Sequence, residues 1–109
     1  MKLSEQKCIP CEGGFPPLTD AEAREQLKQL SGWTLEGVTI KKQYTFKTFP
    51  EAVAFVNKIA VIAEKEGHHP DLFISYNKVT ATLTTHAIKG LSVNDFIIAD
   101  KMDEFYLVC

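Results

Sequence analysis

The sequence lacks long hydrophobic runs, and its longest unbroken ones, Ala52–Val56 and Ile59–Ala63, have about five residues each, too few to cross a bilayer. It also lacks an excess of positive charge: 12 Lys and Arg against 14 Asp and Glu give a net charge of −2, which argues against a nucleic-acid-binding surface. The N-terminus lacks the pattern of a secretory signal peptide. We therefore expect a cytoplasmic protein that contacts neither membrane nor nucleic acid.

Cysteine is scarce as well. The chain has three cysteines, Cys8, Cys11 and Cys109, and an odd count does not indicate a disulfide framework. The C-x-x-C spacing of the first two is typical of half a zinc site or of a redox pair, but a four-ligand zinc site needs a second such pair, which the chain lacks. We predict that residues 1–17, which are rich in glycine and proline, form an extended, flexible N-terminal arm without catalytic role, and that residues 18–109 form one domain.

The rest of the sequence alternates helix and strand signals in the order α-β-β-α-β-β-α. Capping patterns at 19–22, 48–51 and 92–95 each begin a helix, and alternating apolar and polar residues between them indicate two pairs of strands. We predict an α+β fold, a four-stranded antiparallel sheet with three helices packed on one face and water on the other. In the central helix, the expected apolar face consists of Val53, Val56, Ile59, Ala60 and Ala63.

The last predicted helix carries more apolar surface than one face of a small domain needs. This surface is formed by Phe96, Ile97, Ile98, Met102, Phe105 and Tyr106. An apolar surplus of this kind favours a partner subunit, so we expect a homodimer or a homotetramer.

All three histidines fall within residues 64–86. Histidine is the side chain that titrates near neutral pH, so their concentration in one segment indicates proton-transfer chemistry. Glu64 and His68 are four residues apart at the end of the central helix, and we expect them to share one helix face. Gly67 and Pro70 then end that helix.

The following segment is predicted to be a β-hairpin with Asn77 and Lys78 in its turn. This turn fixes a register that puts the apolar side chains on one side of the ladder. Extending the ladder pairs His69 with His86 across the polar side, and the third histidine, at the helix end, would lie close by. Phe73 lies on the same polar side.

In these residues the chain resembles the pterin-4a-carbinolamine dehydratase family. The resemblance extends from about 18 to about 103 and rests on E-x-x-x-H-H-P at 64–70, Y-N-K-V at 76–79, L-T-T-H at 83–86 and G-L-S-x-x-D at 90–95. It implies a dehydratase that converts 4a-hydroxytetrahydrobiopterin to quinonoid dihydrobiopterin and water in tetrahydrobiopterin recycling. The family reaction needs neither a cofactor nor a metal.

The resemblance also implies roles for individual residues. The hydroxyl at C4a must be protonated to leave and the N5 proton must be removed, and both steps are general acid–base chemistry. Catalysis is assigned to His68, His69 and His86, and we expect the proton transfers at His68 and His86 while His69 positions the pterin. Glu64 and Asp95 are the expected supporting carboxylates, and Asp95 also has a structural role at the helix start. The expected substrate-binding residues are Gly67, Phe73, Thr84 and Thr85.

Two other functions fit the sequence. Three histidines, or two of them with Glu64, could supply the ligands of a metal enzyme with an open coordination position. Alternatively, the chain could be a non-catalytic dimerisation or scaffolding module for a regulatory protein, since some members of the family act in this way through helix surfaces.

Overall fold

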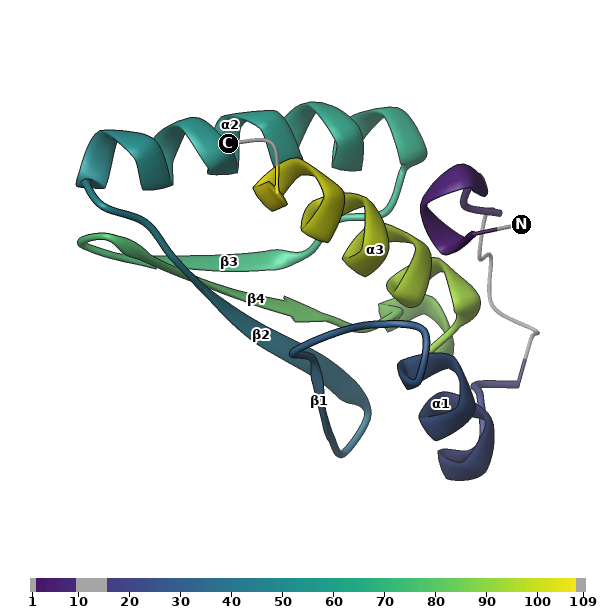
Figure 1. Ribbon diagram of the computed structural model, residues 1–109. Coiled ribbons are helices and arrows are strands. Elements are labelled where there is room, and N and C mark those ends of the chain that lie inside the picture. Colours follow the sequence, from purple (N-terminus) through teal and green to yellow (C-terminus); the bar gives the residue numbers. More distant parts are fainter. Residues whose placement is uncertain (1, 10–15, 108–109) are drawn as a thin grey trace.

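The computed structural model of the chain describes residues 2–9 and 16–107. It confirms the predicted α+β fold and the order α-β-β-α-β-β-α, with the helices on one face of the sheet (Figure 1). The antiparallel sheet has the strand order β1 (Thr34–Glu36), β2 (Thr39–Thr45), β4 (Lys78–Leu83) and β3 (Asp71–Ser75). The helices are α1 (Asp20–Leu27), α2 (Phe49–Glu66) and α3 (Val93–Leu107), with short 3-10 helices η1 (Leu3–Glu5) and η2 (His86–Ile88).

The helix starts follow from their capping residues. The Thr19 hydroxyl accepts the Glu22 N–H at 3.1 Å, and the Glu22 carboxylate accepts the Thr19 N–H at 2.9 Å. These two bonds satisfy donors that the first turn of a helix leaves unpaired. Thr48 accepts the Glu51 N–H in the same way at the start of α2. The predicted helix starts are therefore confirmed.

The core lies between the sheet and the helices. Apolar side chains at alternate positions of β2 and β4 point toward the helices and are 1% exposed or less. They are Ile40, Tyr44, Val79, Ala81 and Leu83. The intervening residues of both strands face away from the helices and are less buried, as expected for a sheet with one wet face.

The predicted apolar face of α2 is partly wrong. The buried residues of α2 are Ala52, Phe55, Ile59 and Ala63, whereas Ala60 is exposed. Phe55 turns inward because it packs among other aromatic rings, and its ring centroid lies 4.8 Å from that of Tyr44. This stripe follows the i, i+3, i+7 spacing of a helix and shares Ile59 and Ala63 with the predicted face, but it is rotated by part of a turn toward Ala52 and Phe55.

The hairpin register differs from the prediction by two residues. Ser75 pairs with Lys78, so the turn consists of Tyr76 and Asn77, and Tyr76 takes a left-handed φ of 53°. Asn77 is held by β2, since its side-chain amide donates to the Phe46 carbonyl at 2.7 Å and its carbonyl accepts the Phe46 N–H at 2.8 Å. A shift of two residues keeps every side chain on its predicted face while changing every cross-strand pair.

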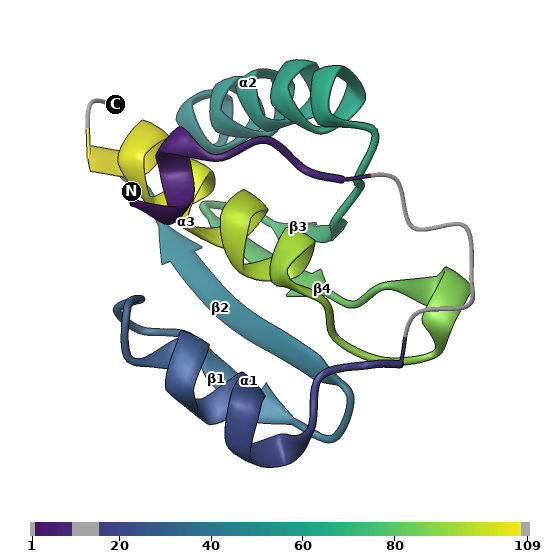
Figure 2. The same cartoon turned by 90° about the vertical axis from the view of Figure 1, so that its right-hand side faces the viewer.

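The apolar surface of α3 is largely buried within the chain itself. Phe96, Ile97, Ile98 and Met102 are all 1% exposed or less. The sheet, α2 and the N-terminal segment surround this helix, so most of the apolar surplus that suggested a partner subunit is used internally (Figure 2).

The N-terminal segment, residues 2–9, packs against α3 and the end of α2. It begins with η1, and Leu3 is only 3% exposed in the core. The Ser4 N–H donates to Asp100 at 2.8 Å, and the Ser4 hydroxyl to Glu104 at 2.7 Å. The prediction of an extended arm without regular structure is therefore wrong for these residues, because side chains of α3 supply partners for its backbone.

Three donors converge on the Asp103 carboxylate of α3. They are the Tyr44 hydroxyl at 2.6 Å, the Lys42 ammonium at 2.8 Å and the Trp33 indole N–H at 3.1 Å. Burial of the ring, followed by the hydrogen bond to Asp103 and its negative charge, raises the pKa of Tyr44 above its ordinary value. The contacts attach α3 to the strands near the C-terminal end of the helix.

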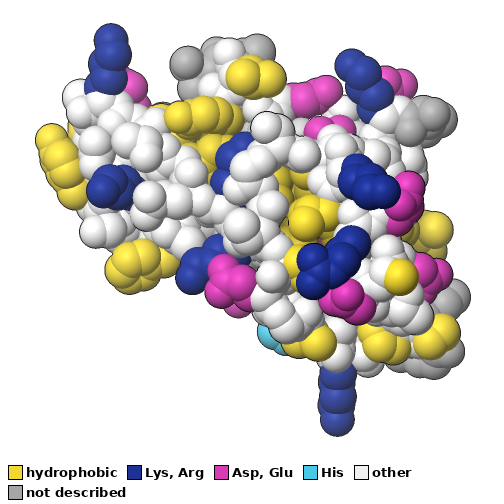
Figure 3. All heavy atoms as spheres, turned by 60° about the horizontal axis from the view of Figure 1, so that its bottom comes forward, with side chains coloured by type: hydrophobic (Ala, Val, Ile, Leu, Met, Phe, Trp, Pro, Cys, Tyr) yellow, Lys and Arg dark blue, Asp and Glu magenta, His cyan; other side chains and the backbone are white. Residues whose placement is uncertain are grey.

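The sheet face opposite the helices is open. Figure 3 looks onto it from below the sheet of Figure 1 and shows basic, acidic and apolar side chains interspersed, with histidine only at the edge of the view. A hollow of about 730 Å³ lies over this face and includes Phe73, which is 67% exposed. None of the helices in the described ranges is long and apolar enough to cross a membrane.

Candidate active site

The three histidines line one pocket of about 220 Å³. His68 and His69 enter it from the loop after α2, and His86 enters it from the start of η2. The remaining lining residues are Ile9, Gly67, Thr84, Thr85, Ala87 and Asn94. The predicted convergence of the histidines is therefore present, although the elements that produce it differ from those expected.

Gly67 sets the direction of the two adjacent histidines. It ends α2 in the left-handed conformation, with φ 69° and ψ 25°, which glycine adopts without steric penalty. The His68 N–H donates to the Ala63 carbonyl at 3.2 Å and closes the end of the helix. The chain then leads the His68 side chain inward, where it is 11% exposed, and the His69 side chain outward, where it is 60% exposed.

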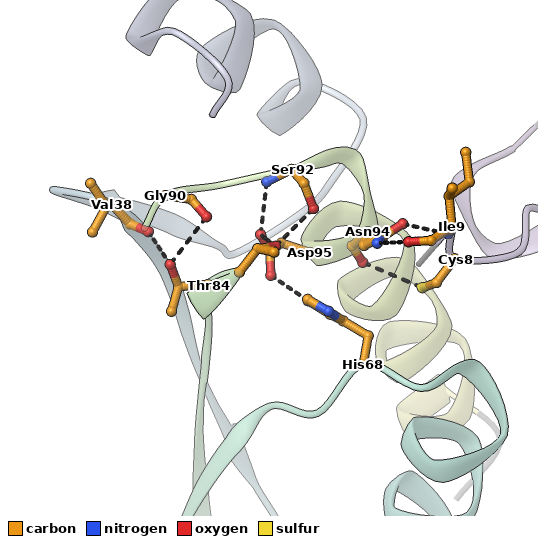
Figure 4. Close-up of polar contacts among 10 residues, drawn as sticks. Cys8, Ile9, Val38, His68, Thr84, Gly90, Ser92, Asn94 and Asp95 are labelled. Atoms are coloured by element: carbon orange, nitrogen blue, oxygen red, sulfur yellow. Dashed lines mark hydrogen bonds and ion pairs between the residues drawn. The ribbon is translucent and has the colours of Figure 1, made fainter. Parts of the chain in front are cut away.

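His68 is paired with Asp95. Its Nε2 lies 2.6 Å from Asp95 Oδ1, and the Asp95 side chain is fully buried in the first turn of α3 (Figure 4). An ionised carboxylate only accepts hydrogen bonds, so Nε2 carries the proton of this contact. In the neutral ring, Nδ1 is then the nitrogen that can accept a proton.

Asp95 is itself held in place by two further donors. Its Oδ2 accepts the Thr85 hydroxyl at 2.8 Å and the Ser92 N–H at 2.9 Å. The hydroxyls of Thr85 and Ser92 are also hydrogen-bonded to each other at 2.8 Å. Asp95 thus has the structural role expected at the start of α3, and it also contacts a histidine, while its supporting role in catalysis stays a prediction. A buried carboxylate with three donors is fixed in position.

Glu64 contacts a different histidine from the one predicted. Glu64 Oε1 lies 2.8 Å from His69 Nε2, not against His68. The i,i+4 spacing applies only within a helix, and the left-handed Gly67 directs His68 away from that face. Both members of the pair are exposed, at 60% for His69 and 82% for Glu64, so solvent weakens their electrostatic interaction.

His86 does not pair with His69 across the strands. β4 ends at Leu83, and a bridge between Thr85 and Gly90 then returns the chain around η2. His86 is the first residue of η2 and is exposed at the mouth of the pocket. The predicted ladder extension is wrong, and the shared pocket depends on the 84–90 loop instead.

The predicted substrate-binding residues divide into two groups. Gly67, Thr84 and Thr85 line the histidine pocket, whereas Phe73 lines the hollow on the open sheet face. The Thr84 hydroxyl donates to the Val38 carbonyl at 2.7 Å (Figure 4). Thr85 is only 3% exposed, and its hydroxyl donates to Asp95. The structure therefore does not bring Phe73 to the histidines, because odd-numbered β3 residues face away from the helices.

The predicted alternative of a metal enzyme depends on a cluster of ligating side chains. Within residues 2–9 and 16–107, no three side chains of His, Cys, Asp or Glu are close enough together to hold a metal ion. Cys8 lies beside the start of α3, with its Sγ 3.8 Å from the Asn94 carbonyl oxygen. Cys11 and Cys109 lie outside the described residues, so the interpretation of the C-x-x-C motif stays a prediction.

Three residues that line the pocket were not predicted: Ala87, which follows His86, and the distant pair Ile9 and Asn94. The Asn94 side chain accepts the Ile9 N–H at 2.9 Å and donates to the Ile9 carbonyl at 2.6 Å. The two residues are 85 positions apart, which no local pattern could reveal. The only signal was the position of Asn94, directly before the Asp95 of the capping motif.

The sequence and the fold of the chain are similar to those of known proteins. The model of the family described as pterin 4 alpha carbinolamine dehydratase matches residues 16–105. A protein of Nitrosospira multiformis named "Putative pterin-4-alpha-carbinolamine dehydratase" is 46% identical over 106 residues, which cover 97% of this chain and 94% of that protein. A protein of Nitrosomonas eutropha with the same name is 49% identical over 102 residues, covering 93% and 90%.

Solved structures show the same fold. The crystal structure of a "transcriptional coactivator/pterin dehydratase" from Brucella melitensis has a TM-score of 0.79 and 38% identity, and the match covers 83% of this chain and 98% of that one. A pterin dehydratase-like protein described as a RuBisCO assembly factor in the alpha-carboxysome has a TM-score of 0.61 at 20% identity, over 70% of this chain and 90% of that one. At that identity the second similarity concerns the fold alone.

Proposed function

Because the chain belongs to the pterin 4 alpha carbinolamine dehydratase family, we propose that it converts 4a-hydroxytetrahydrobiopterin to quinonoid dihydrobiopterin and water by histidine general acid–base catalysis. In this reaction the C4a–O bond breaks, the C4a–N5 double bond forms, and the N5 proton is lost. The product becomes a tetrahydropterin again when it takes up two electrons and two protons, so we place the reaction in tetrahydrobiopterin recycling in the cytoplasm.

The observation that carries this proposal is the His68–Asp95 contact in a pocket shared with two further histidines. The buried carboxylate holds the His68 ring in one orientation and one tautomer, so a defined ring nitrogen is left to exchange a proton with the substrate. It also compensates the positive charge that forms on the ring when a proton is taken up. The reaction requires a group that can donate or accept a proton at each of its two proton transfers.

The second proton transfer is assigned to His86. His86 belongs to η2 and lines the same pocket as His68, which belongs to the loop after α2. The two rings therefore approach a bound ligand from separate parts of the chain. His69 is assigned to positioning of the pterin, since its Nε2 is already engaged by Glu64. One histidine donates a proton to the departing hydroxyl while the other removes the N5 proton.

The proposal is tested by following the dehydration of synthetic 4a-hydroxytetrahydropterin by absorbance. Wild type, His68→Ala and His86→Ala are compared, with a metal chelator added to parallel reactions and thermal melts recorded for each protein. We expect wild-type turnover to survive the chelator and each variant to lose about 10²- to 10⁴-fold in kcat, the usual contribution of a general acid or base. Wild type without acceleration over the spontaneous reaction would overturn the proposal, and turnover abolished by the chelator would favour a metal enzyme.

A non-catalytic function is the second candidate, because the similar Brucella melitensis protein is described as a transcriptional coactivator as well as a pterin dehydratase. In that case this chain would act through its helix surfaces as a dimerisation or scaffolding module. A variant with all three histidines replaced by alanine discriminates between the functions. It keeps a scaffolding activity and loses a catalytic one.

A further inference from the structure

We propose that Ile9 contacts the substrate, and that Asn94 is the positioning residue that holds it at the pocket. This inference rests on the proposed function, because the ligand of the pocket is taken to be a pterin. The N-terminal segment, residues 2–9, then forms one wall of the binding site, where a flexible arm was predicted.

The Ile9 backbone is fixed at the pocket by paired hydrogen bonds. The Asn94 amide accepts from the Ile9 N–H at 2.9 Å and donates to the Ile9 carbonyl at 2.6 Å (Figure 4). Both residues line the same pocket as the three histidines. Asn94 is 3% exposed and directly precedes Asp95. In the first turn of α3, Asn94 therefore holds Ile9 and Asp95 orients His68.

The residues before Ile9 are anchored by separate contacts. Cys8 N–H donates to Glu66 Oε1 at 2.8 Å, and the Lys101 ammonium donates to the Ser4 carbonyl at 2.8 Å. Leu3 is buried in the core at 3% exposure. Since the segment is held at its start, its middle and its end, the position of Ile9 is determined by the fold and not by chance contact of a loose terminus.

The chemistry of the pocket indicates what Ile9 contacts. The other side chains that line it are mostly polar, and Ile9 adds a branched apolar side chain that is 61% exposed. A pterin is a compact bicyclic ring with hydrogen-bonding groups along its edge and less polar faces. The polar residues suit the edge, and Ile9 suits one face, where its burial by the ring would contribute to binding.

This contact lies outside the part of the chain that the family model describes, which begins at residue 16. The Nitrosospira multiformis relative matches 97% of the chain, so that match extends into the N-terminal segment. Substrate contact by Ile9 would therefore be a property of chains that carry this segment, added to the family core.

Steady-state kinetics of Ile9→Ser test the contact. An apolar contact on the ring face is made in the ground state and in the transition state alike, so its loss raises KM and leaves kcat unchanged. We expect KM to rise roughly fivefold, with Ile9→Val close to wild type. Leu107→Ser is the matched control, because Leu107 is an exposed apolar residue, 81% exposed, at the other end of α3.

A double-mutant cycle tests the role of Asn94. If Asn94 acts through Ile9, Asn94→Ala raises KM, and the double variant with Ile9→Ser is no worse than the more affected single variant. Effects on KM that multiply would overturn the positioning role, and unchanged KM in Ile9→Ser would overturn the contact. Thermal melts identify a variant that is merely unstable. Failure of the proposed function is distinct, since it is seen as absence of turnover in the wild type.

Discussion

His68 Nε2 lies 2.6 Å from Asp95 Oδ1, and this contact joins the loop after α2 to the first turn of α3. The histidine is the last member of a short chain of hydrogen bonds. Ser92 and Thr85 hold the carboxylate, and the carboxylate holds the imidazole. The orientation of the ring thus depends on a buried carboxylate and on the two residues that hold it, of which Thr85 also lines the pocket.

Asp95→Asn tests this dependence. The substituted amide has nearly the same shape but can donate to His68, which favours the opposite ring tautomer. We expect kcat to fall about 10- to 100-fold with little change in KM. This loss is smaller than the full contribution of an acid or base catalyst, because the histidine itself is still present. Glu64→Gln is the control, because its contact with His69 is exposed, and its kcat is expected to change by less than about threefold. Equal losses in the two variants would contradict the assignment.

The raised pKa of Tyr44 predicts that the folded protein loses stability at alkaline pH. Burial, together with Asp103, raises the pKa of Tyr44 in the folded state, whereas an unfolded tyrosine ionises near pH 10. Above that pH the unfolded chain has released this proton and the folded chain has not, so the free energy of unfolding falls by up to about 1.4 kcal/mol per pH unit. Below it the contribution is fully present.

Urea unfolding at several pH values between about 9 and 11.5 measures this effect. Tyr44→Phe is expected to be less stable at neutral pH, by about 1–3 kcal/mol for the lost hydrogen bond to a carboxylate, and to lose stability less steeply with rising pH. Tyr76→Phe is the matched control, since Tyr76 is 69% exposed. Parallel pH profiles for wild type and Tyr44→Phe would show that this tyrosine does not carry the effect.

Gly67→Ala measures the cost of backbone strain at the end of α2, because steric crowding of the added methyl group does not contribute there. Nothing lies within 4 Å of a Cβ added at this position, but its φ of 69° is unfavourable for alanine. We expect the free energy of unfolding to fall by about 1–2 kcal/mol from the left-handed conformation alone. Gly67→Asn, which tolerates this region better, is expected to lose less. Equal losses for alanine and asparagine would point to another cause.

Tyr76→Gly is expected to stabilise the protein. Tyr76 adopts a φ of 53° in the hairpin turn, and its side chain is 69% exposed, so few contacts offset the strain of the left-handed conformation. Glycine relieves this strain, although it also gives the unfolded chain more conformational freedom. The free energy of unfolding is therefore expected to rise by a net amount of roughly 0.5–1 kcal/mol. Chemical denaturation checks the sign. Ser75→Gly, in the adjoining strand, is expected to destabilise instead.

The fold was predictable because its signals are local. The capping bonds of Thr19 and Thr48 require only residues three positions away, and the inward side chains of β2 alternate as a half-buried strand must. The clustering of the histidines was equally visible, since a single segment of the sequence contains them.

The contacts within the site were less predictable because they depend on distant residues. Asn77 pairs with Phe46, 31 positions away, and this fixes a turn that local preference would place elsewhere. Gly67 was recognised as the helix end, but the direction in which its left-handed conformation sends His68 depends on where Asp95 lies. The Ile9–Asn94 pair spans 85 positions, beyond any spacing argument.

The position of Asn94 and Asp95 in α3, after the sheet in the sequence, has a consequence for biosynthesis. A ribosome releases these two residues only after all four strands and α2 have emerged. Until then His68 has no carboxylate to orient it and Ile9 has no amide to hold it, even if the sheet has already formed. A nascent chain arrested before α3 is therefore expected to be inactive, because the pocket is completed only when this helix joins the elements made before it.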